Sequence, residues 1–103
     1  MGASYPFGPD AHVFKVLDKM FALVAVGSAP LRVSLKCDPE RALILRETYA
    51  AVQPGYHLNK RHWNTLTLDG SLSDELVLQL VAHSYELVFK SLKKAERERL
   101  GAR

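Results

Sequence analysis

The sequence predicts a single α+β domain in which helices cover one face of an antiparallel sheet. Residues 31–36 and 63–68 alternate between apolar and polar side chains, as half-buried strands do. An apolar stripe with helical spacing follows Ser73, and the turns between the first strands are too short for parallel pairing. The 103 residues suit one domain, and the expected order is β-β-β-α-β(-β)-α.

The first half of the chain contains three expected strands. A turn-rich segment, residues 5–10, precedes strands over 12–17 and 20–26. The second of these is apolar at nearly every position, which predicts a central strand covered on both faces. The third strand, 31–36, should bury its odd-numbered side chains. Its even-numbered side chains are polar and should face away from the core.

The first helix has a clear start. Asp38-Pro39-Glu40 combines an N-cap carboxylate, a proline at the first helical position and an acid in the first turn. We expect the helix to run to about Tyr49, with Ala42, Leu45 and Tyr49 on one face. Gln53-Pro54-Gly55 then stops any helical structure.

The second half contains one or two strands and a long helix. In the strand over 63–68, Leu66 and Leu68 should point inward and the two threonines outward. Ser71 or Ser73 should cap the long helix, because acids and helically spaced leucines and valines follow. The last segment, 93–103, is charged throughout and is expected to fray.

The composition limits the classes of function. A net charge of +3 permits weak attraction to phosphate backbones or anionic lipid but requires neither. One cysteine excludes an internal disulfide. No apolar run approaches the ~20 residues of a membrane span, and the first residues do not resemble a signal peptide. We therefore expect a cytoplasmic protein.

A segment rich in potential binding groups lies around the only tryptophan. Its cations could contact phosphates, Trp63 could stack on bases, and the amides could touch base edges. The polar side of strand 31–36 could extend this surface. The candidate nucleic-acid-binding residues are Arg32, Lys36, Asn59, Lys60, Arg61, Trp63 and Asn64. The alternative interpretation is that Trp63 packs, that Lys60-Arg61 is a solvated turn, and that the sheet face is plain.

The sequence gives little support for a metal site or for a catalytic site. The four histidines, His12, His57, His62 and His83, form no pair at metal-ligand spacing. Cys37 shares the inward side of its strand with Leu35, so we expect a buried structural thiol. There are no paired carboxylates, no serine elbow and no glycine-rich phosphate loop. We therefore expect no catalytic residue, no metal and no cofactor, and a protein that is not an enzyme.

Several motifs together resemble the MmcQ/YjbR family. They span nearly the whole chain in order: Tyr5 to Asp10, Phe14 to Val16, Lys19 to Ala22, Leu35 to Pro39, Pro54 to Thr65, Asp69 to Leu72, Asp74 to Leu76 and His83 to Tyr85. The resemblance implies a bacterial protein with a CyaY-like or secretion-chaperone-like fold and the description "double wing" DNA-binding, with no typical enzymatic activity.

One departure from the family pattern matters for partners. Family members usually carry a helix before the Tyr5-Pro6-Phe7-Gly8 motif, and only four residues precede it here. Without that helix, part of the apolar sheet face would lose its cover, which favours a homodimer or an imperfectly stable monomer. The alternative function is therefore a protein-interaction or chaperone-like module that oligomerises through this face.

Overall fold

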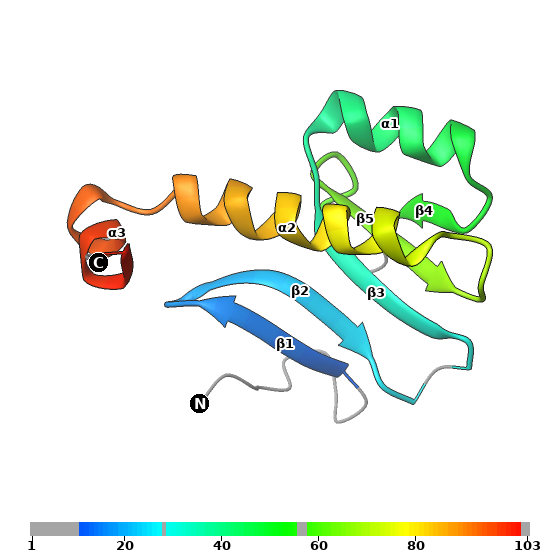
Figure 1. Ribbon diagram of the computed structural model, residues 1–103, viewed down its shortest axis with the longest axis horizontal. Coiled ribbons are helices and arrows are strands. Elements are labelled where there is room, and N and C mark those ends of the chain that lie inside the picture. Colours follow the sequence, from blue (N-terminus) through cyan, green and yellow to red (C-terminus); the bar gives the residue numbers. More distant parts are fainter. Residues whose placement is uncertain (1–10, 28, 56–57, 102–103) are drawn as a thin grey trace.

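The computed structural model describes residues 11–27, 29–55 and 58–101. Its five strands and three helices follow the expected order, with one additional helix at the end (Figure 1). They are β1 (Ala11–Val16), β2 (Lys19–Ala25), β3 (Leu31–Lys36), α1 (Pro39–Thr48), β4 (Val52–Pro54), β5 (Trp63–Leu68), α2 (Asp74–Lys90) and α3 (Lys94–Gly101). The expected turn-rich segment 5–10 lies outside the described residues.

The strands form one antiparallel sheet in the order β1-β2-β3-β5-β4. This confirms the predicted fold class, and β3 and β5 have the predicted bounds. The short strand β4 is the optional strand of the expected order. It pairs with the outer side of β5, so that β3 and β5 are direct neighbours in the middle of the sheet.

Both long helices lie on one face of this sheet. α1 contacts β4 and β5, and α2 contacts the other three strands (Figure 1). Their apolar sides meet the strands in a single main core. It comprises Ala22, Leu35, Cys37, Ala42, Leu45, Ala51, Val52, Leu66, Leu72 and Leu80. The helices therefore cover part of the inner face, and the opposite, outer face carries the polar side chains of β3 and β5.

The helix starts follow the expected capping chemistry. The Asp38 carboxylate accepts a hydrogen bond from the Glu40 amide at 3.0 Å, and the Ser73 hydroxyl accepts one from the Leu76 amide at 3.1 Å. Ser73, rather than Ser71, is thus the N-cap of α2. Ser71 instead closes the preceding turn, donating its hydroxyl to the Asp69 carboxylate at 2.6 Å.

A buried serine joins α2 to two strands. Ser84 is 0% exposed; its hydroxyl donates to the Phe21 carbonyl at 2.6 Å and accepts from the Lys36 amide at 2.9 Å. The β2–β3 pairing begins at Ala22 and Leu35, so these two backbone groups lie just beyond its end. The Ser84 side chain satisfies both and fixes the height of the helix above the sheet.

The outer face is less solvated than the alternation of β3 and β5 predicts. Thr65 points away from the helices, as expected, but it is buried, and its hydroxyl lies 2.7 Å from that of Ser34. Farther along this face, Leu58 packs against a buried cluster of Ala11, Val13 and Leu23. The loop before β5 therefore covers part of the outer face. A polar side chain that the alternation places on this face is consequently not always exposed to water.

The expectation for β2 was partly wrong. The strand is central, between β1 and β3, but only Ala22 and Leu23 are buried. Met20, Phe21 and Val24 remain partly exposed. Met20 packs against the outer-face cluster of Ala11, Val13 and Leu23, whereas Val24 lies on a part of the inner face that the helices cover incompletely.

The segment 93–103, which was expected to fray, contains a further helix. Residues Lys94–Gly101 form α3, and the Glu96 carboxylate accepts from the Lys93 amide at 2.9 Å, which favours helix initiation. Leu100 packs against a cluster that includes Val16, Val88 and Leu92. One apolar residue therefore attaches a charged helix to the fold. Within the described ranges, no helix is long and apolar enough to cross a membrane.

Candidate functional site

A hollow of about 310 Å³ lies on the outer face of the sheet, where β3, β4 and β5 run side by side. Strand register explains its lining, because Arg32 is paired with Thr67 and Gln53 with Thr65. The hollow is lined by Arg32, Gln53, Pro54, Lys60, Thr65 and Thr67. These residues supply two cations, an amide and two hydroxyls, and none of them is acidic.

The cations extend beyond the hollow along β3 and the loop before β5. Lys36 lies four residues after Arg32 on the same strand, so both side chains leave the outer face about 13 Å apart. Lys60 and Arg61 lie in the exposed loop, and the Lys60 ammonium donates to the Gly55 carbonyl at 3.1 Å. The structure thus places Arg32, Lys36 and Lys60 on the outer side of the sheet, and the exposed Arg61 follows Lys60 in the chain.

Arg46 holds the loop that carries Lys60. Its Nε atom donates to the Asn64 side-chain oxygen at 2.6 Å, and a terminal nitrogen donates to the backbone carbonyls of Lys60 and Trp63. The Asn64 amide in turn donates to the Ala42 carbonyl at 3.3 Å. A single guanidinium therefore links the last turn of α1 to the start of β5.

This network changes the role of Asn64. The strand alternation places it on the inner face with Leu66, and the structure buries it there. Its side chain is engaged by Arg46 and Ala42, so it supports the loop rather than presenting an amide to a base edge.

Trp63 packs inside the protein. It is 9% exposed, and its backbone carbonyl accepts from the Gly55 amide at 2.8 Å. The backbones approach so closely that a Cβ atom on Gly55 would lie 2.7 Å from the Trp63 Cβ. These contacts favour the packing interpretation of Trp63 over an exposed stacking platform.

Asn59 is exposed but already has a local role. Its side-chain oxygen accepts from the Arg61 amide at 2.9 Å, which forms a tight Asx-type turn. Of the seven predicted residues, Arg32, Lys36 and Lys60 lie on the outer side and Arg61 is exposed in the loop, whereas Asn59, Trp63 and Asn64 shape the loop.

Sequence reasoning missed Gln53 and Arg46. Gln53 joins the hollow only because β4 pairs with β5, and a three-residue strand ending at Pro54 gives almost no periodic signal. Arg46 lies in the last turn of α1, where a basic residue suits the helix dipole and needs no other explanation. Neither residue could be identified without knowing the strand order.

The inner side of the protein holds titratable groups with a structural role. Cys37 is buried, as expected, and burial raises the pKa of its thiol. Burial, with Arg41 adding to it, lowers the pKa of His83, whose Nε2 atom accepts from the Asp38 amide at 3.3 Å. The hydrogen bond from Ser71 lowers the pKa of Asp69. These groups cap helices and turns and converge on no reactive centre.

Metal-binding side chains are dispersed across the part of the chain that the structure describes. No three of its histidine, cysteine and acidic side chains gather in a way that could hold an ion. His57, one of the four histidines considered above, lies outside the described residues.

Comparison with known proteins identifies relatives along most of the chain. The YjbR family model matches residues 2–87. An uncharacterized protein named YbdF, from Escherichia coli O157:H7, is 34% identical over 96 residues, 93% of this chain and 79% of its own. The uncharacterized protein YjbR of E. coli K12 is 43% identical over 86 residues, 84% of this chain and 73% of its own.

Solved structures share the fold. The crystal structure of Deinococcus radiodurans DR2400, a DUF419 domain, superimposes with a TM-score of 0.88 at 45% identity. The match covers 96% of this chain and 76% of that one. A crystal structure of a Pseudomonas syringae protein gives a TM-score of 0.71 at 29% identity, covering 84% of this chain and 85% of that one.

Proposed function

The chain belongs to the MmcQ/YjbR family, and from this premise we propose that it is a small, non-enzymatic protein that binds nucleic acid through the outer face of its sheet. The "double wing" DNA-binding description that accompanies the family resemblance motivates the choice of ligand. The binding would take place in the cytoplasm.

The observation that supports this proposal most strongly is the cationic hollow. Arg32 and Lys60 are distant in sequence, yet they line one hollow together with Gln53, Thr65 and Thr67. Positive side chains beside hydroxyl and amide groups are the combination that contacts phosphate and sugar oxygens. Among the described residues that line the hollow none is acidic, so these side chains do not repel an anionic ligand.

The arrangement favours backbone contact over base recognition. Lys36 on β3 and the exposed Arg61 add charge beyond the hollow, whereas Trp63 and Asn64, the groups suited to stacking and base edges, are buried. Arg32 and Lys36 are separated by about 13 Å along β3, so they would contact different phosphates. We therefore propose binding that is weak, strongly salt-dependent and nearly independent of sequence.

The proposal is tested with end-labelled single-stranded and duplex DNA by fluorescence anisotropy at about 50 mM salt. The double variant Lys60→Gln/Arg61→Gln should weaken binding about tenfold or more, because two phosphate contacts are removed. Glutamine at position 60 keeps a donor for the Gly55 carbonyl, so the loop should remain in place.

The matched control is Lys94→Gln/Arg97→Gln, which removes the same charge from α3 at exposed positions. It should change the affinity less than about twofold. Equal losses of affinity in the two double variants would mean that only the net charge of the protein matters, which would contradict binding through the outer face. Failure of the unsubstituted protein to bind DNA would refute the proposal. Emission from buried Trp63 verifies that each variant is folded.

A further inference from the structure

Helix α2 is apolar on two neighbouring sides, and the rest of the fold covers the second side only in part. The side facing the sheet carries Leu80, Ser84 and Val88, all buried. Next to it runs a second row, Leu78, Val81, Tyr85 and Phe89, at spacings that keep these residues on one side of a helix. Leu78 is 68% exposed and Tyr85 is 41% exposed, whereas Val81 and Phe89 pack partly against buried clusters.

Beside this second row, the described part of the sheet also exposes large apolar side chains. Phe14, on the inner face of β1, is 44% exposed, and Leu31 at the start of β3 is exposed as well. The register places Phe14 opposite Ala22 and Leu31 opposite Leu68, so all four share the inner face. The partly buried Val24 and Val33 lie between them. The second row of α2 and these strand residues together form one surface, which we call the apolar strip. It is about 25 Å long, because it follows the 17 residues of α2.

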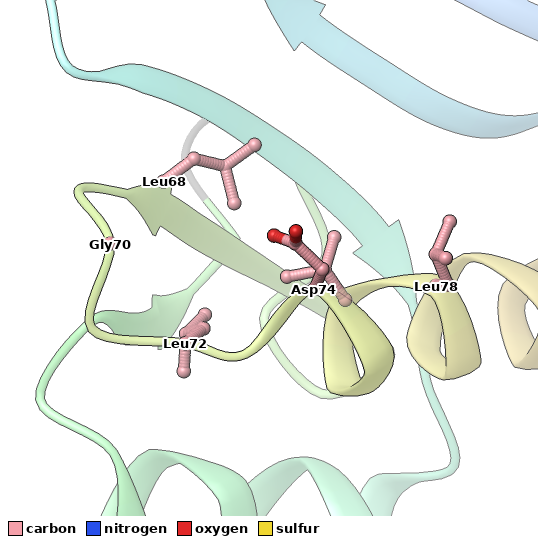
Figure 2. A pocket seen from close by; sticks show the side chains of 6 residues that line it. Leu68, Gly70, Leu72, Asp74 and Leu78 are labelled. Atoms are coloured by element: carbon pink, nitrogen blue, oxygen red, sulfur yellow. The ribbon is translucent and has the colours of Figure 1, made fainter.

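The strip deepens into a pocket at the start of α2. This pocket, of about 380 Å³, is lined by Leu68, Gly70, Leu72, Asp74, Val77 and Leu78. Figure 2 shows the Asp74 carboxylate between Leu68 and Leu78, so a negative charge borders the apolar lining. An apolar side chain from a partner could enter here beside a cation that pairs with Asp74.

The two ends of α2 carry opposite charge. The first end has the acids Asp69, Asp74 and Glu75. The other end has Lys19, Lys90, Lys93, Lys94, Arg97 and Arg99, against Glu86, Glu96 and Glu98, and Glu86 pairs with Lys90 at 3.8 Å. Lys19 belongs to this end because its ammonium donates to the Ser91 carbonyl at 3.1 Å. A surface with an acidic end and a basic end is complementary to itself when a copy is turned end over end.

We propose that a second copy of this chain covers the strip, with the two α2 helices antiparallel about a two-fold axis near Ala82. In a two-fold symmetric interface of this kind, each contact between two different residues occurs twice, once on each side of the axis. It places Leu78 of one copy near Tyr85 of the second copy, and the acids of each copy near the lysines of the other. Ala82 is exposed and small, so two helix backbones can approach closely where they cross. The outer face remains open in this dimer.

The first test is sedimentation equilibrium over a range of concentrations up to about 1 mM. The mass should rise from 11.5 kDa toward twice that value. Leu78→Glu should raise the dissociation constant about tenfold or more, because it places a carboxylate in the apolar strip. Ile44→Glu is the matched control, since Ile44 is 61% exposed on α1, outside the strip, and should leave the dissociation constant unchanged.

The second test addresses the symmetry. The variant Ala82→Cys should form a disulfide between two copies on mild oxidation with oxidised glutathione, because residues beside a two-fold axis meet their own equivalents. The native thiol, Cys37, is buried and should not react. Ile44→Cys provides the comparison and should cross-link at only the rate of random collision.

A third test addresses the opposite charges at the two ends of α2. Glu75→Lys alone should weaken the dimer, and Glu75→Lys combined with Lys90→Glu should restore it, because the exchanged charges again face opposite signs. A chain that stays monomeric at about 1 mM overturns the proposal. So does a dimer that Leu78→Glu leaves intact, or one in which Ala82→Cys and Ile44→Cys cross-link equally.

Discussion

The Arg46 guanidinium donates from Nε to the side-chain oxygen of the buried Asn64 at 2.6 Å, and the same group donates to the carbonyls of Lys60 and Trp63. One side chain from α1 thus satisfies three acceptors in the segment that carries the candidate cations. The position of Lys60 beside the hollow depends on this arginine, although Arg46 itself does not line the hollow.

Replacing Arg46 should therefore lower the stability of the whole protein and also loosen the loop that carries Lys60. Arg46→Ala leaves the Asn64 oxygen buried without its donor, and we expect a loss of about 1–3 kcal/mol in the free energy of unfolding. Urea denaturation measures this loss. Glu47→Ala, at an exposed neighbouring position on α1, should change stability by less than about 0.5 kcal/mol. Similar losses in the two variants would contradict the role assigned to Arg46.

Two glycines should respond to alanine for different reasons. At Gly55 a Cβ atom would lie 2.7 Å from the Trp63 Cβ, so Gly55→Ala must displace the β4–β5 backbone and shift the tryptophan emission to the red. At Gly70 there is open space but φ is +92°, so Gly70→Ala should cost about 1 kcal/mol from backbone strain.

Fluorescence spectra and urea midpoints of both glycine variants separate the two causes. Gly70→Ala should lower the midpoint and leave the emission of Trp63 unchanged. If Gly55→Ala also leaves the emission unchanged, the close contact between β4 and Trp63 is not as described.

Ser84 offers a test of how α2 is attached to the sheet. Ser84→Ala removes the partner of both the Phe21 carbonyl and the Lys36 amide, and should cost about 2 kcal/mol or more in the free energy of unfolding. Ser71→Ala deletes an exposed hydroxyl from the turn at Asp69 and should cost much less. Hydrogen exchange should show faster exchange of the Lys36 amide in Ser84→Ala only.

His83 should make stability depend on pH near neutrality. Burial lowers its pKa in the folded protein below the ordinary value of 6.5, so the unfolded chain binds the proton more readily. The stabilising contribution is therefore complete above pH 6.5 and is lost as the pH falls below that value toward the folded pKa. Protonation also disrupts acceptance of the Asp38 amide by Nε2.

The measurement for His83 is the urea midpoint between pH 7.5 and pH 5, compared with His83→Gln. Other groups titrate in this range as well, so the informative quantity is the difference between the two proteins. The midpoint of the unsubstituted protein should fall more steeply on acidification. Parallel curves would show that His83 does not contribute.

The regular elements could be predicted from the sequence because their signals are local. The alternation of β3 and β5 and the Asp38-Pro39-Glu40 cap of α1 depend on side chains close together in the chain. The resemblance to the family added the overall fold. The helical state of Lys94–Gly101 was missed because it depends on Leu100 reaching a cluster formed by Val16, Val88 and Leu92.

The candidate site could be predicted only in part, for a related reason. Alternation predicts which face a residue joins, so it assigned Arg32 and Lys36 correctly to the outer face. Asn64 was instead predicted to contact a base edge, and the structure buries it on the inner face. It does not predict what covers a face. The burial of Trp63 and Thr65 follows from tertiary packing on the outer face, which no local pattern in the sequence shows.

The salt dependence of DNA binding tests the proposed interface most directly. If Arg32, Lys36, Lys60 and Arg61 each neutralise one phosphate, a plot of log K against log salt for single-stranded DNA should have a slope of about −3. Lys60→Gln should reduce the magnitude of that slope by about 0.7, while Lys94→Gln leaves it unchanged. A slope near zero, or one that Lys60→Gln does not alter, would contradict binding through the outer face of the sheet.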